Sequence, residues 1–332
     1  MAAGSRDAAE SVCYDSCLRK LAAAAGFVAL LAALWEAARY FGVSSQIDQH
    51  WPSTVASCVL LLLPYWAFGF GLDRSEWIER TKSAVTPLIL LTAYPLFAIP
   101  RGIFRWDMCV GMAAIVFSIG LLLTFADPKQ PEWRDWLVLA ILGISVDLHF
   151  FDKAWPIAGL NSMPKLLFVD AGLYGYLVLR PIGGIGYDFR PRRTDFRIGL
   201  REFLFFTPMA IALGFALAFL HFHKTFSNPV WFASGWVFTL FFIAVPEELF
   251  FRGLMLNMLE RKIGTRAALI LTALLFGLAH FNKRAAYFNW RYVILAAIAG
   301  IFYGRAWLSD RRILTSSVTH ATVDTVWSIW LR

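Results

Sequence analysis

Long runs of apolar residues alternate with short polar stretches along almost the whole chain. An α-helix needs about 20 apolar residues to cross the hydrocarbon core of a bilayer, and most of these runs approach that length. The predicted fold is therefore all-α, a polytopic transmembrane helical bundle with about eleven spans. The predicted spans are 21–42, 53–72, 83–99, 108–126, 136–151, 164–180, 203–222, 231–256, 266–280, 292–308 and 313–331.

The composition agrees with a membrane protein and disagrees with a soluble one. Hydrophobic residues make up 58% of the 332 residues and charged residues only 16%, whereas a soluble domain carries about 25% charged residues. The formal net charge is +8, but the basic residues lie mostly in the loops between the apolar runs. We therefore expect the lipid bilayer as a partner and no nucleic acid.

The distribution of basic residues between alternate loops predicts the orientation. If the N-terminus is cytoplasmic, the loops on that side carry 20 Lys and Arg residues, and those on the other side carry nine. Such a bias is typical of cytoplasmic loops. No small-residue cleavage site follows the first run, which indicates an uncleaved anchor. The prediction is a multi-pass protein of a bacterial-type cytoplasmic membrane, with its N-terminus in the cytoplasm.

The longest polar stretch, residues 181–202, divides the chain. It combines glycines and prolines with five arginines, and it is typical of a cytoplasmic turn or hairpin. Its arginines are expected at the anionic leaflet of the membrane. The predicted organisation is an N-terminal transmembrane half of unknown role at residues 1–180, this connector, and a second membrane domain at residues 203–332.

Charged residues interrupt the predicted span 231–256. Glu247, Glu248 and Arg252 lie there within six positions, and each charge near the bilayer centre costs about 2.5–3.5 kcal/mol. Glu248 and Arg252 are four residues apart, so they share a helix face and are predicted to pair. Glu247 is rotated by about 100° from its neighbour. It is therefore left free to face a ligand, which makes this stretch a candidate functional site.

Two further polar groups occur in later apolar runs. His280 ends the run 266–280, and His320 lies four residues before Asp324 in the last run. A turn is expected at Gly264, which lies 17 positions after Glu247 and 16 positions before His280. At 1.5 Å per residue, both residues lie roughly 24–26 Å from the turn. In an antiparallel hairpin, Glu247 and His280 would stand side by side.

These residues form three motifs in a specific order. The motifs are Glu247-Glu248-x-x-x-Arg252, Phe276-x-x-x-His280 and His320-x-x-x-Asp324. The set resembles the motifs of the CAAX-protease and bacteriocin-processing family (CPBP, or Abi). That family includes the type II CAAX prenyl endopeptidases, which are glutamic intramembrane proteases. The resemblance covers roughly residues 200–332 and leaves residues 1–180 without an assigned role.

The resemblance implies a role for each motif residue. The residue matching Glu247 is the base, the match to His280 helps to activate the attacking water, and the match to His320 belongs to the oxyanion site. Glu248 and Arg252 would hold the helix and orient Glu247. No cofactor is implied.

Asp324 departs from the family pattern, in which this position is usually Asn. An ionised carboxylate would repel a developing oxyanion. Asp324 is therefore expected either to donate a hydrogen bond as a carboxylic acid or to orient His320.

The expected function is endoproteolytic cleavage of a membrane-associated protein or peptide, without carrying over the prenylated substrate of eukaryotic relatives. One alternative is a zinc protease that uses Glu247, His280 and His320 as ligands. No His-Glu-x-x-His motif supplies paired ligands, which disfavours it. A second alternative is a non-enzymatic bacteriocin-immunity or regulatory membrane protein. A third is a transporter, because buried charges also mark ion pathways.

Overall fold

The computed structural model describes residues 3–331 except 41–44, 46, 48, 72–77, 79, 158–159, 161, 224–228 and 284–286. Within these ranges the regular secondary structure is helical, and no described residue lies in a β-strand. The all-α prediction is therefore confirmed for the described part of the chain. The chain forms two compact units, one of Met1–Pro128 and Glu132–Pro181 and one of Lys129–Pro131 and Ile182–Arg332. We call them the N-terminal and the C-terminal unit.

The N-terminal unit contains helices of uneven length, and most of its core lies where α3 packs against α5 and α8. Its elements are α1 (Ala3–Tyr40), α3 (Trp51–Gly69), η2 (Thr86–Thr92), α5 (Ala93–Ala98), α6 (Trp106–Thr124), α7 (Trp133–Asp147), η3 (Asp152–Ala154), α8 (Met163–Tyr174) and η4 (Gly175–Leu179).

A buried ion pair joins two of these elements. Arg180, directly after η4, lies with its guanidinium 3.2 Å from the carboxylate of Asp135 in the first turn of α7, and neither side chain is more than 1% exposed. Asp135 also accepts a hydrogen bond from the backbone N–H of Glu132 at 2.8 Å, so it caps the start of α7.

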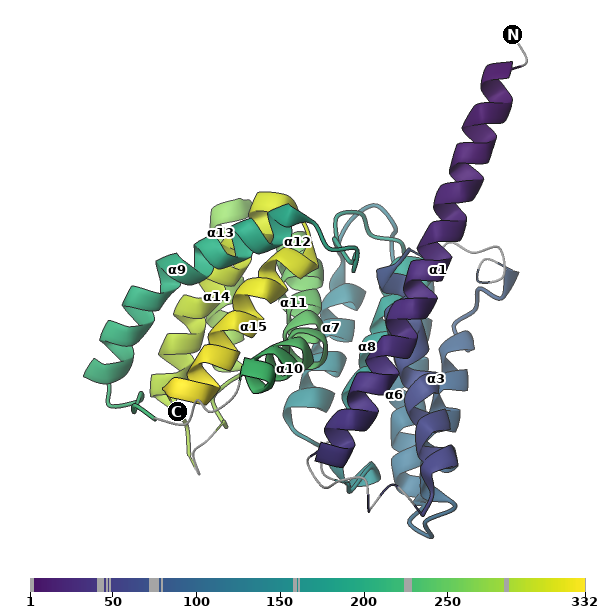
Figure 1. The fold of residues 1–332 in the computed structure, drawn as a ribbon, viewed down its shortest axis with the longest axis horizontal. Coiled ribbons are helices and arrows are strands. Elements are labelled where there is room, and N and C mark those ends of the chain that lie inside the picture. Colours follow the sequence, from purple (N-terminus) through teal and green to yellow (C-terminus); the bar gives the residue numbers. More distant parts are fainter. Residues whose placement is uncertain are drawn as a thin grey trace. The chain divides into compact units, whose positions relative to one another are not determined.

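The C-terminal unit is a helical bundle in which α13, α14 and α15 pack against the long helix around Glu247, and α9 packs against α14 and α15 (Figure 1). Its elements are α9 (Arg193–Ala216), α10 (Pro229–Thr239), η5 (Leu240–Ala244), α11 (Val245–Glu248), η6 (Leu249–Leu256), α12 (Asn257–Ile263), α13 (Thr265–Leu278), α14 (Trp290–Asp310) and α15 (Ile313–Trp330).

The predicted spans and the helices agree in place but differ in length. Each of the eleven predicted runs overlaps at least one helix. Four helices are long and apolar enough to cross a membrane, namely α3, α6, α9 and α14. Helix α9 begins at Arg193, so its first turns occupy residues predicted to form the polar connector. The structure therefore supports a membrane helical bundle, and eleven crossings remain a prediction.

The helix that carries Glu247 changes its winding around Pro246. Elements α10, η5, α11, η6 and α12 follow one another without a break, and η5 and η6 are π-helical. A proline inside an α-helix lacks an N–H group, and its ring collides with the carbonyl four residues earlier. The wider π turns on both sides of Pro246 make room for the ring, and π turns are frequent at functional sites. Glu247 and Glu248 therefore lie in a short α-helical turn between two widened segments.

Two glycines allow α13 and α14 to pack backbone against backbone. A Cβ atom on Gly277 would lie 2.5 Å from the carbonyl oxygen of Val293, and one on Gly300 would lie 3.1 Å from Cα of Ala273. The hairpin that leads into α13 turns at Gly264, where φ is +77° as a glycine allows. The predicted turn is thus present, and the close packing exposes the carbonyl of Gly300 to the site described below.

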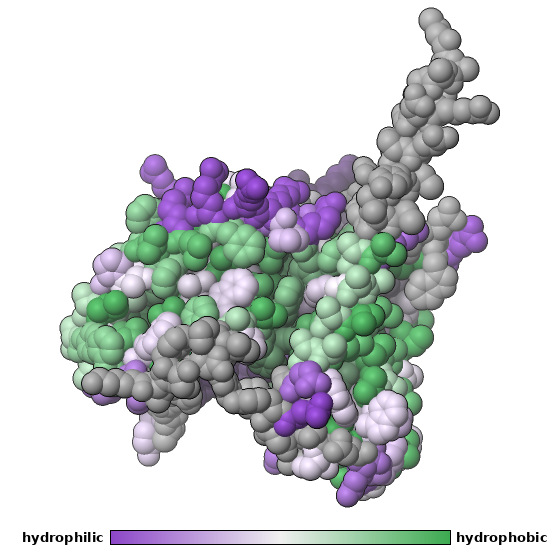
Figure 2. Space-filling model, viewed as in Figure 1, coloured by the Kyte–Doolittle hydropathy of each residue, from purple (hydrophilic) through white to green (hydrophobic). Residues whose placement is uncertain are grey.

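The surface of the C-terminal unit is divided by polarity. Figure 2 shows a hydrophilic band along the edge where α9 and α13 begin, beside a broad hydrophobic surface. Exposed arginines at this edge include Arg192, Arg193 and Arg197. Further along α9, Leu204 and Phe205 are 65% and 53% exposed. An apolar outward face of this kind suits contact with lipid.

Candidate active site

The centre of the site is a buried cluster of three side chains. Glu248 Oε1 accepts hydrogen bonds from Arg252 Nη1 at 3.0 Å and from His320 Nδ1 at 2.9 Å. None of the three side chains is more than 3% exposed. The ion pair predicted from the spacing of Glu248 and Arg252 is therefore present, and a histidine from α15 shares its carboxylate.

Arg252 also holds the neighbouring helices. Its Nη2 donates to the carbonyl oxygen of Gly300 at 3.0 Å, and its guanidinium lies 4.5 Å from the ring centroid of Phe276. A buried guanidinium is stable only when its donors and its charge are compensated. Arg252 consequently fixes the helix of Glu248 against α13 and α14.

His320 faces carboxylates with both ring nitrogens. Because the oxygen of Glu248 can only accept, the hydrogen at that contact belongs to Nδ1. The other nitrogen, Nε2, lies 3.5 Å from Asp324 Oδ2 and 3.8 Å from Glu247 Oε2. The two less enclosed carboxylates of the site, those of Asp324 and Glu247, thus both face Nε2.

Glu247 is the more open of the two adjacent glutamates. Its side chain is 37% exposed, whereas that of Glu248 is fully buried. Even so, Glu247 Oε2 is itself enclosed and has no hydrogen-bond partner among the described residues. A buried carboxylate oxygen without a donor is unfavourable and invites a ligand. This matches the prediction that Glu247 faces something other than Arg252.

His280 occupies the turn that follows α13. Its Nδ1 lies 2.8 Å from the carbonyl oxygen of Phe276, so Nδ1 donates and Nε2 is left as an acceptor in the neutral ring. The ring of Phe276 lies between the two histidines, with centroids 4.8 Å from His280 and 5.7 Å from His320. Both imidazoles therefore pack against the ring of Phe276.

The described contacts pair Glu247 with His320, and no ion pair or hydrogen bond joins Glu247 to His280 in the described part of the chain. The level estimated for Glu247 assumed α-helical rise throughout, but the helix between Glu247 and Gly264 contains the eight π-helical residues of η6. A π turn holds more residues than an α turn, so the α-helical rise used in the estimate does not apply to η6. The side-by-side placement of Glu247 and His280 stays a prediction.

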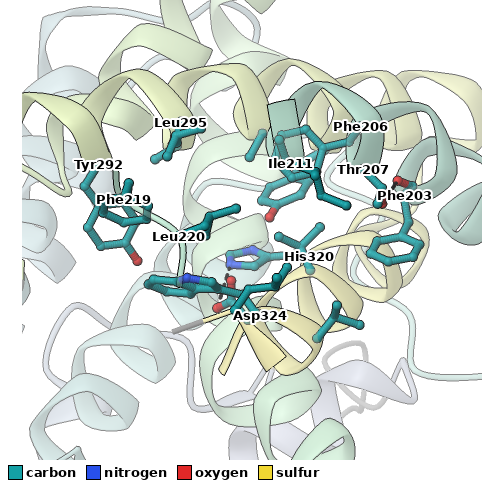
Figure 3. A pocket seen from close by; sticks show the side chains of 18 of the residues that line it. Phe203, Phe206, Thr207, Ile211, Phe219, Leu220, Tyr292, Leu295, His320 and Asp324 are labelled. Carbon is teal, nitrogen blue, oxygen red and sulfur yellow. Dashed lines mark hydrogen bonds and ion pairs between the residues drawn. The ribbon is translucent and has the colours of Figure 1, made fainter. Parts of the chain in front are cut away.

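An open cavity of about 100 Å³ reaches the histidines. His280, His320 and Asp324 line it together with apolar and aromatic side chains of α9, α14 and α15. Figure 3 shows His320 and Asp324 next to each other, with Phe206, Ile211 and Leu220 around them. An apolar pocket with a few convergent polar groups is a place where a ligand is expected.

One residue of this cluster is missing from the sequence motifs. Tyr303 of α14 is 2% exposed, and its ring stacks on that of His320 with centroids 4.5 Å apart and 16° between the planes. Its position in the apolar run 292–308 carries no local signal, because an aromatic residue in such a run is ordinary core. The stacking of Tyr303 on His320 depends on how α14 and α15 pack against each other.

The donor set does not by itself form a metal site. Among the described residues, no group of three His, Cys, Asp or Glu side chains is arranged to hold a metal ion. The ligands of the zinc alternative, Glu247, His280 and His320, all lie at the site, but the described contacts join only Glu247 and His320.

Comparison with known proteins locates the family resemblance. A family model described as type II CAAX prenyl endopeptidase Rce1-like matches residues 229–326. The matched segment contains all three motifs, from Glu247 to Asp324. No curated protein and no solved structure matched the chain. The resemblance expected from the motifs is thereby confirmed for residues 229–326, which are similar to the type II CAAX prenyl endopeptidase Rce1-like family.

Proposed function

We propose that this protein is a membrane-embedded endopeptidase in which Glu247 activates a water molecule. The observation that carries the proposal is the placement of Glu247 Oε2. This oxygen is enclosed, lacks a hydrogen-bond partner among the described residues, and lies 3.8 Å from His320 Nε2 beside an apolar cavity. Both atoms are within reach of a single bridging water.

The reaction follows from these positions. Water attacks the carbonyl carbon of the scissile peptide bond, and its proton passes to Glu247. The electrons of the C=O bond move onto oxygen, and when this intermediate collapses the C–N bond breaks. The proton then passes from Glu247 to the leaving amine nitrogen. His280 lines the same cavity and offers Nε2 as an acceptor for the peptide or the water.

The buried pair of Glu248 and Arg252 orients His320 without touching the substrate. Glu248 fixes one nitrogen of His320, so the other nitrogen is directed towards Glu247 and Asp324. Such preorganisation accounts for much of the rate enhancement in hydrolytic enzymes.

The substrate we propose is a membrane-associated protein or peptide, because the cavity walls are apolar and the C-terminal unit has an apolar outward face. The name of the matching family mentions prenyl endopeptidases of the CAAX type. A pool of quenched fluorescent peptides with four randomised residues before the C-terminus, in prenylated and unprenylated forms, separates a requirement for the lipid from a requirement for the peptide.

The proposal is tested with the Glu247→Gln variant in detergent. Gln is nearly isosteric with Glu but cannot accept the proton, so we expect cleavage of the peptide pool to fall at least 10³-fold while the melting temperature stays close to that of the wild type. Comparison of protein termini in cells carrying wild-type or variant protein identifies natural substrates, whose precursors accumulate in the variant. Cleavage by the variant at the wild-type rate would remove Glu247 as the base.

The zinc alternative is decided by a separate measurement. Metal analysis of the active protein, followed by activity after treatment with a chelator, distinguishes a metal-dependent hydrolysis from one that depends on Glu247 alone. An intact protein that cleaves no member of the pool would favour the immunity or regulatory alternative.

We also propose that the chain crosses the membrane eleven times with its N-terminus in the cytoplasm. The support is the excess of Lys and Arg on alternate loops and the hydrophilic edge at the start of α9. Labelling of single cysteines introduced into successive loops with a membrane-impermeant reagent tests each crossing.

A further inference from the structure

Tyr303 completes a closed circuit of contacts at the site. Its ring stacks on His320, whose Nδ1 donates to Glu248. Glu248 accepts from Arg252, and the guanidinium of Arg252 lies 5.3 Å from the ring centroid of Tyr303. Each member therefore touches two others, and Tyr303 is the one that the sequence motifs omit. Such a circuit fixes the position of the phenol ring as firmly as that of the imidazole.

The hydroxyl of Tyr303, by contrast, has no hydrogen-bond partner among the residues that the structure describes. The contacts of this residue with described residues are made by its ring, with Phe276, His320 and Arg252. Tyrosines buried to this degree normally bond through their hydroxyl. Because Tyr303 lines the cavity, its hydroxyl is available to a group that enters there.

Several other polar groups of the cavity wall already have partners. The hydroxyl of Thr207 donates to the carbonyl oxygen of Phe203 at 2.7 Å, and Nδ1 of His280 donates to that of Phe276. His320 directs its nitrogens towards three carboxylates. An ionised Asp324 can only accept. A negative charge that develops on a substrate oxygen here is repelled by these carboxylates and is stabilised by any hydrogen-bond donor that faces it.

We propose that the Tyr303 hydroxyl is a catalytic group, which donates a hydrogen bond to the carbonyl oxygen of the scissile bond as that oxygen becomes negative. The inference rests on the proposed peptidase function and adds a residue to it. Tyr303 and Asp324 line the same cavity. A phenol held on a rigid ring is an effective oxyanion donor because it needs no reorganisation during the reaction.

The test uses Tyr303→Phe in the full-length protein and the peptide of the quenched pool that the wild type cleaves best. Phe keeps the ring stack on His320 and removes only the donor. We expect kcat to fall about 10²-fold, as for the loss of one oxyanion donor. KM should stay within about threefold, because the bond strengthens only in the transition state. The melting temperature should not fall, since the hydroxyl bonds no described residue.

Tyr176→Phe is the matched control. Tyr176 is also buried, but its hydroxyl donates to the backbone oxygen of Asp135 at 3.2 Å in the N-terminal unit. We expect this variant to melt at a lower temperature and to keep the wild-type kcat. Tyr303→Phe should therefore lower activity without lowering stability, and Tyr176→Phe should lower stability without lowering activity. If the loss of any buried hydroxyl had the same general effect, the two variants would not differ in this way.

Failure of this inference and failure of the proposed function give different results. If the wild type cleaves, Glu247→Gln does not, and Tyr303→Phe keeps kcat within threefold, then the Tyr303 donor is wrong and the peptidase stands. If Tyr176→Phe loses as much kcat as Tyr303→Phe, the donor is equally overturned. If the wild type cleaves no peptide, or Glu247→Gln cleaves as fast as the wild type, the proposed function fails and the inference falls with it.

Discussion

The two units contain arginine–carboxylate pairs that are nearly identical in isolation. Arg180 and Asp135 in the N-terminal unit lie 3.2 Å apart, Arg252 and Glu248 in the C-terminal unit lie 3.0 Å apart, and all four side chains are almost fully buried. The carboxylate of Asp135 caps a helix. That of Glu248 is shared with an imidazole whose other nitrogen points at two further carboxylates beside a cavity.

A buried ion pair is therefore not in itself a sign of function. Breaking such a pair is costly wherever it lies, since an uncompensated charge remains behind. What distinguishes the C-terminal pair is a titratable partner that links it to a cavity. Three sets of variants test this difference between the two units.

The largest effect is expected from removing each arginine. Arg252→Ala and Arg180→Ala should each lower the free energy of unfolding by about 3–5 kcal/mol, because each leaves a buried carboxylate without its cation. Only Arg252→Ala should also lower kcat of the protein that remains folded, since only its partner orients His320. Thermal melting and kinetics per folded molecule measure the two effects.

Two further outcomes check this reading. Glu248→Gln should partly restore the stability of Arg252→Ala by removing the unpaired charge. A fully stable Arg252→Ala protein would contradict the pair, and a loss of kcat in Arg180→Ala would show that the N-terminal pair also serves the reaction.

A smaller effect is expected at Asp324, a residue for which we describe no equivalent beside the ion pair of the N-terminal unit. Asp324→Asn keeps an oxygen that can accept from His320 and adds an N–H donor, so kcat should stay within about tenfold of the wild type. Asp324→Ala removes the nearer of the two carboxylates that face Nε2 and should lose most activity, more than tenfold. The measurement is the cleavage rate of the best peptide of the pool. Full activity in Asp324→Ala would exclude Asp324 from the site.

The smallest effect concerns a third cluster, outside the spanning helices, in which Arg312 binds Asp188 and Asp195. Burial alone would raise the pKa of Asp188, but hydrogen bonds from Arg190 and Arg312 outweigh it and lower the pKa to about 2. A lowered pKa stabilises the fold above the unfolded pKa, about 4, and the stabilisation disappears as the pH falls through 2. Solvent screening at this half-buried site reduces the effect to about 1 kcal/mol.

Asp188→Asn should therefore be less stable than the wild type at pH 6 by about 1 kcal/mol, with the difference vanishing near pH 2. Urea unfolding at both pH values measures it. A difference of equal size at pH 2 would mean that the carboxylate acts through packing and not through charge.

The sequence predicted those parts of the structure that depend on neighbours along the chain. Apolar runs predicted the helices, the spacing of Glu248 and Arg252 predicted their pairing, and Gly264 predicted the hairpin turn. The contacts of His320 with Glu248 and of Tyr303 with His320 join helices far apart in the sequence. No local pattern contains them, because they depend on how α14 and α15 pack.

The sequence pattern also did not predict the π-helical winding of the helix that carries Glu247. The π-helical residues of η6 lie between Glu247 and the turn at Gly264, and a constant α-helical rise per residue does not describe them. The site was thus predictable as a set of residues, while the pairing of Glu247 with His320 needed the three-dimensional arrangement.

The ion pair of Glu248 and Arg252 has a consequence for how the protein is made. Both residues belong to one continuous helix, so they can neutralise each other as that helix enters the lipid during synthesis, before α14 and α15 have emerged. Each lone charge would oppose insertion by about 2.5–3.5 kcal/mol. Insertion of these two charges therefore requires no partner helix. The contact of Glu248 with His320 can form later, when α15 has entered the bilayer.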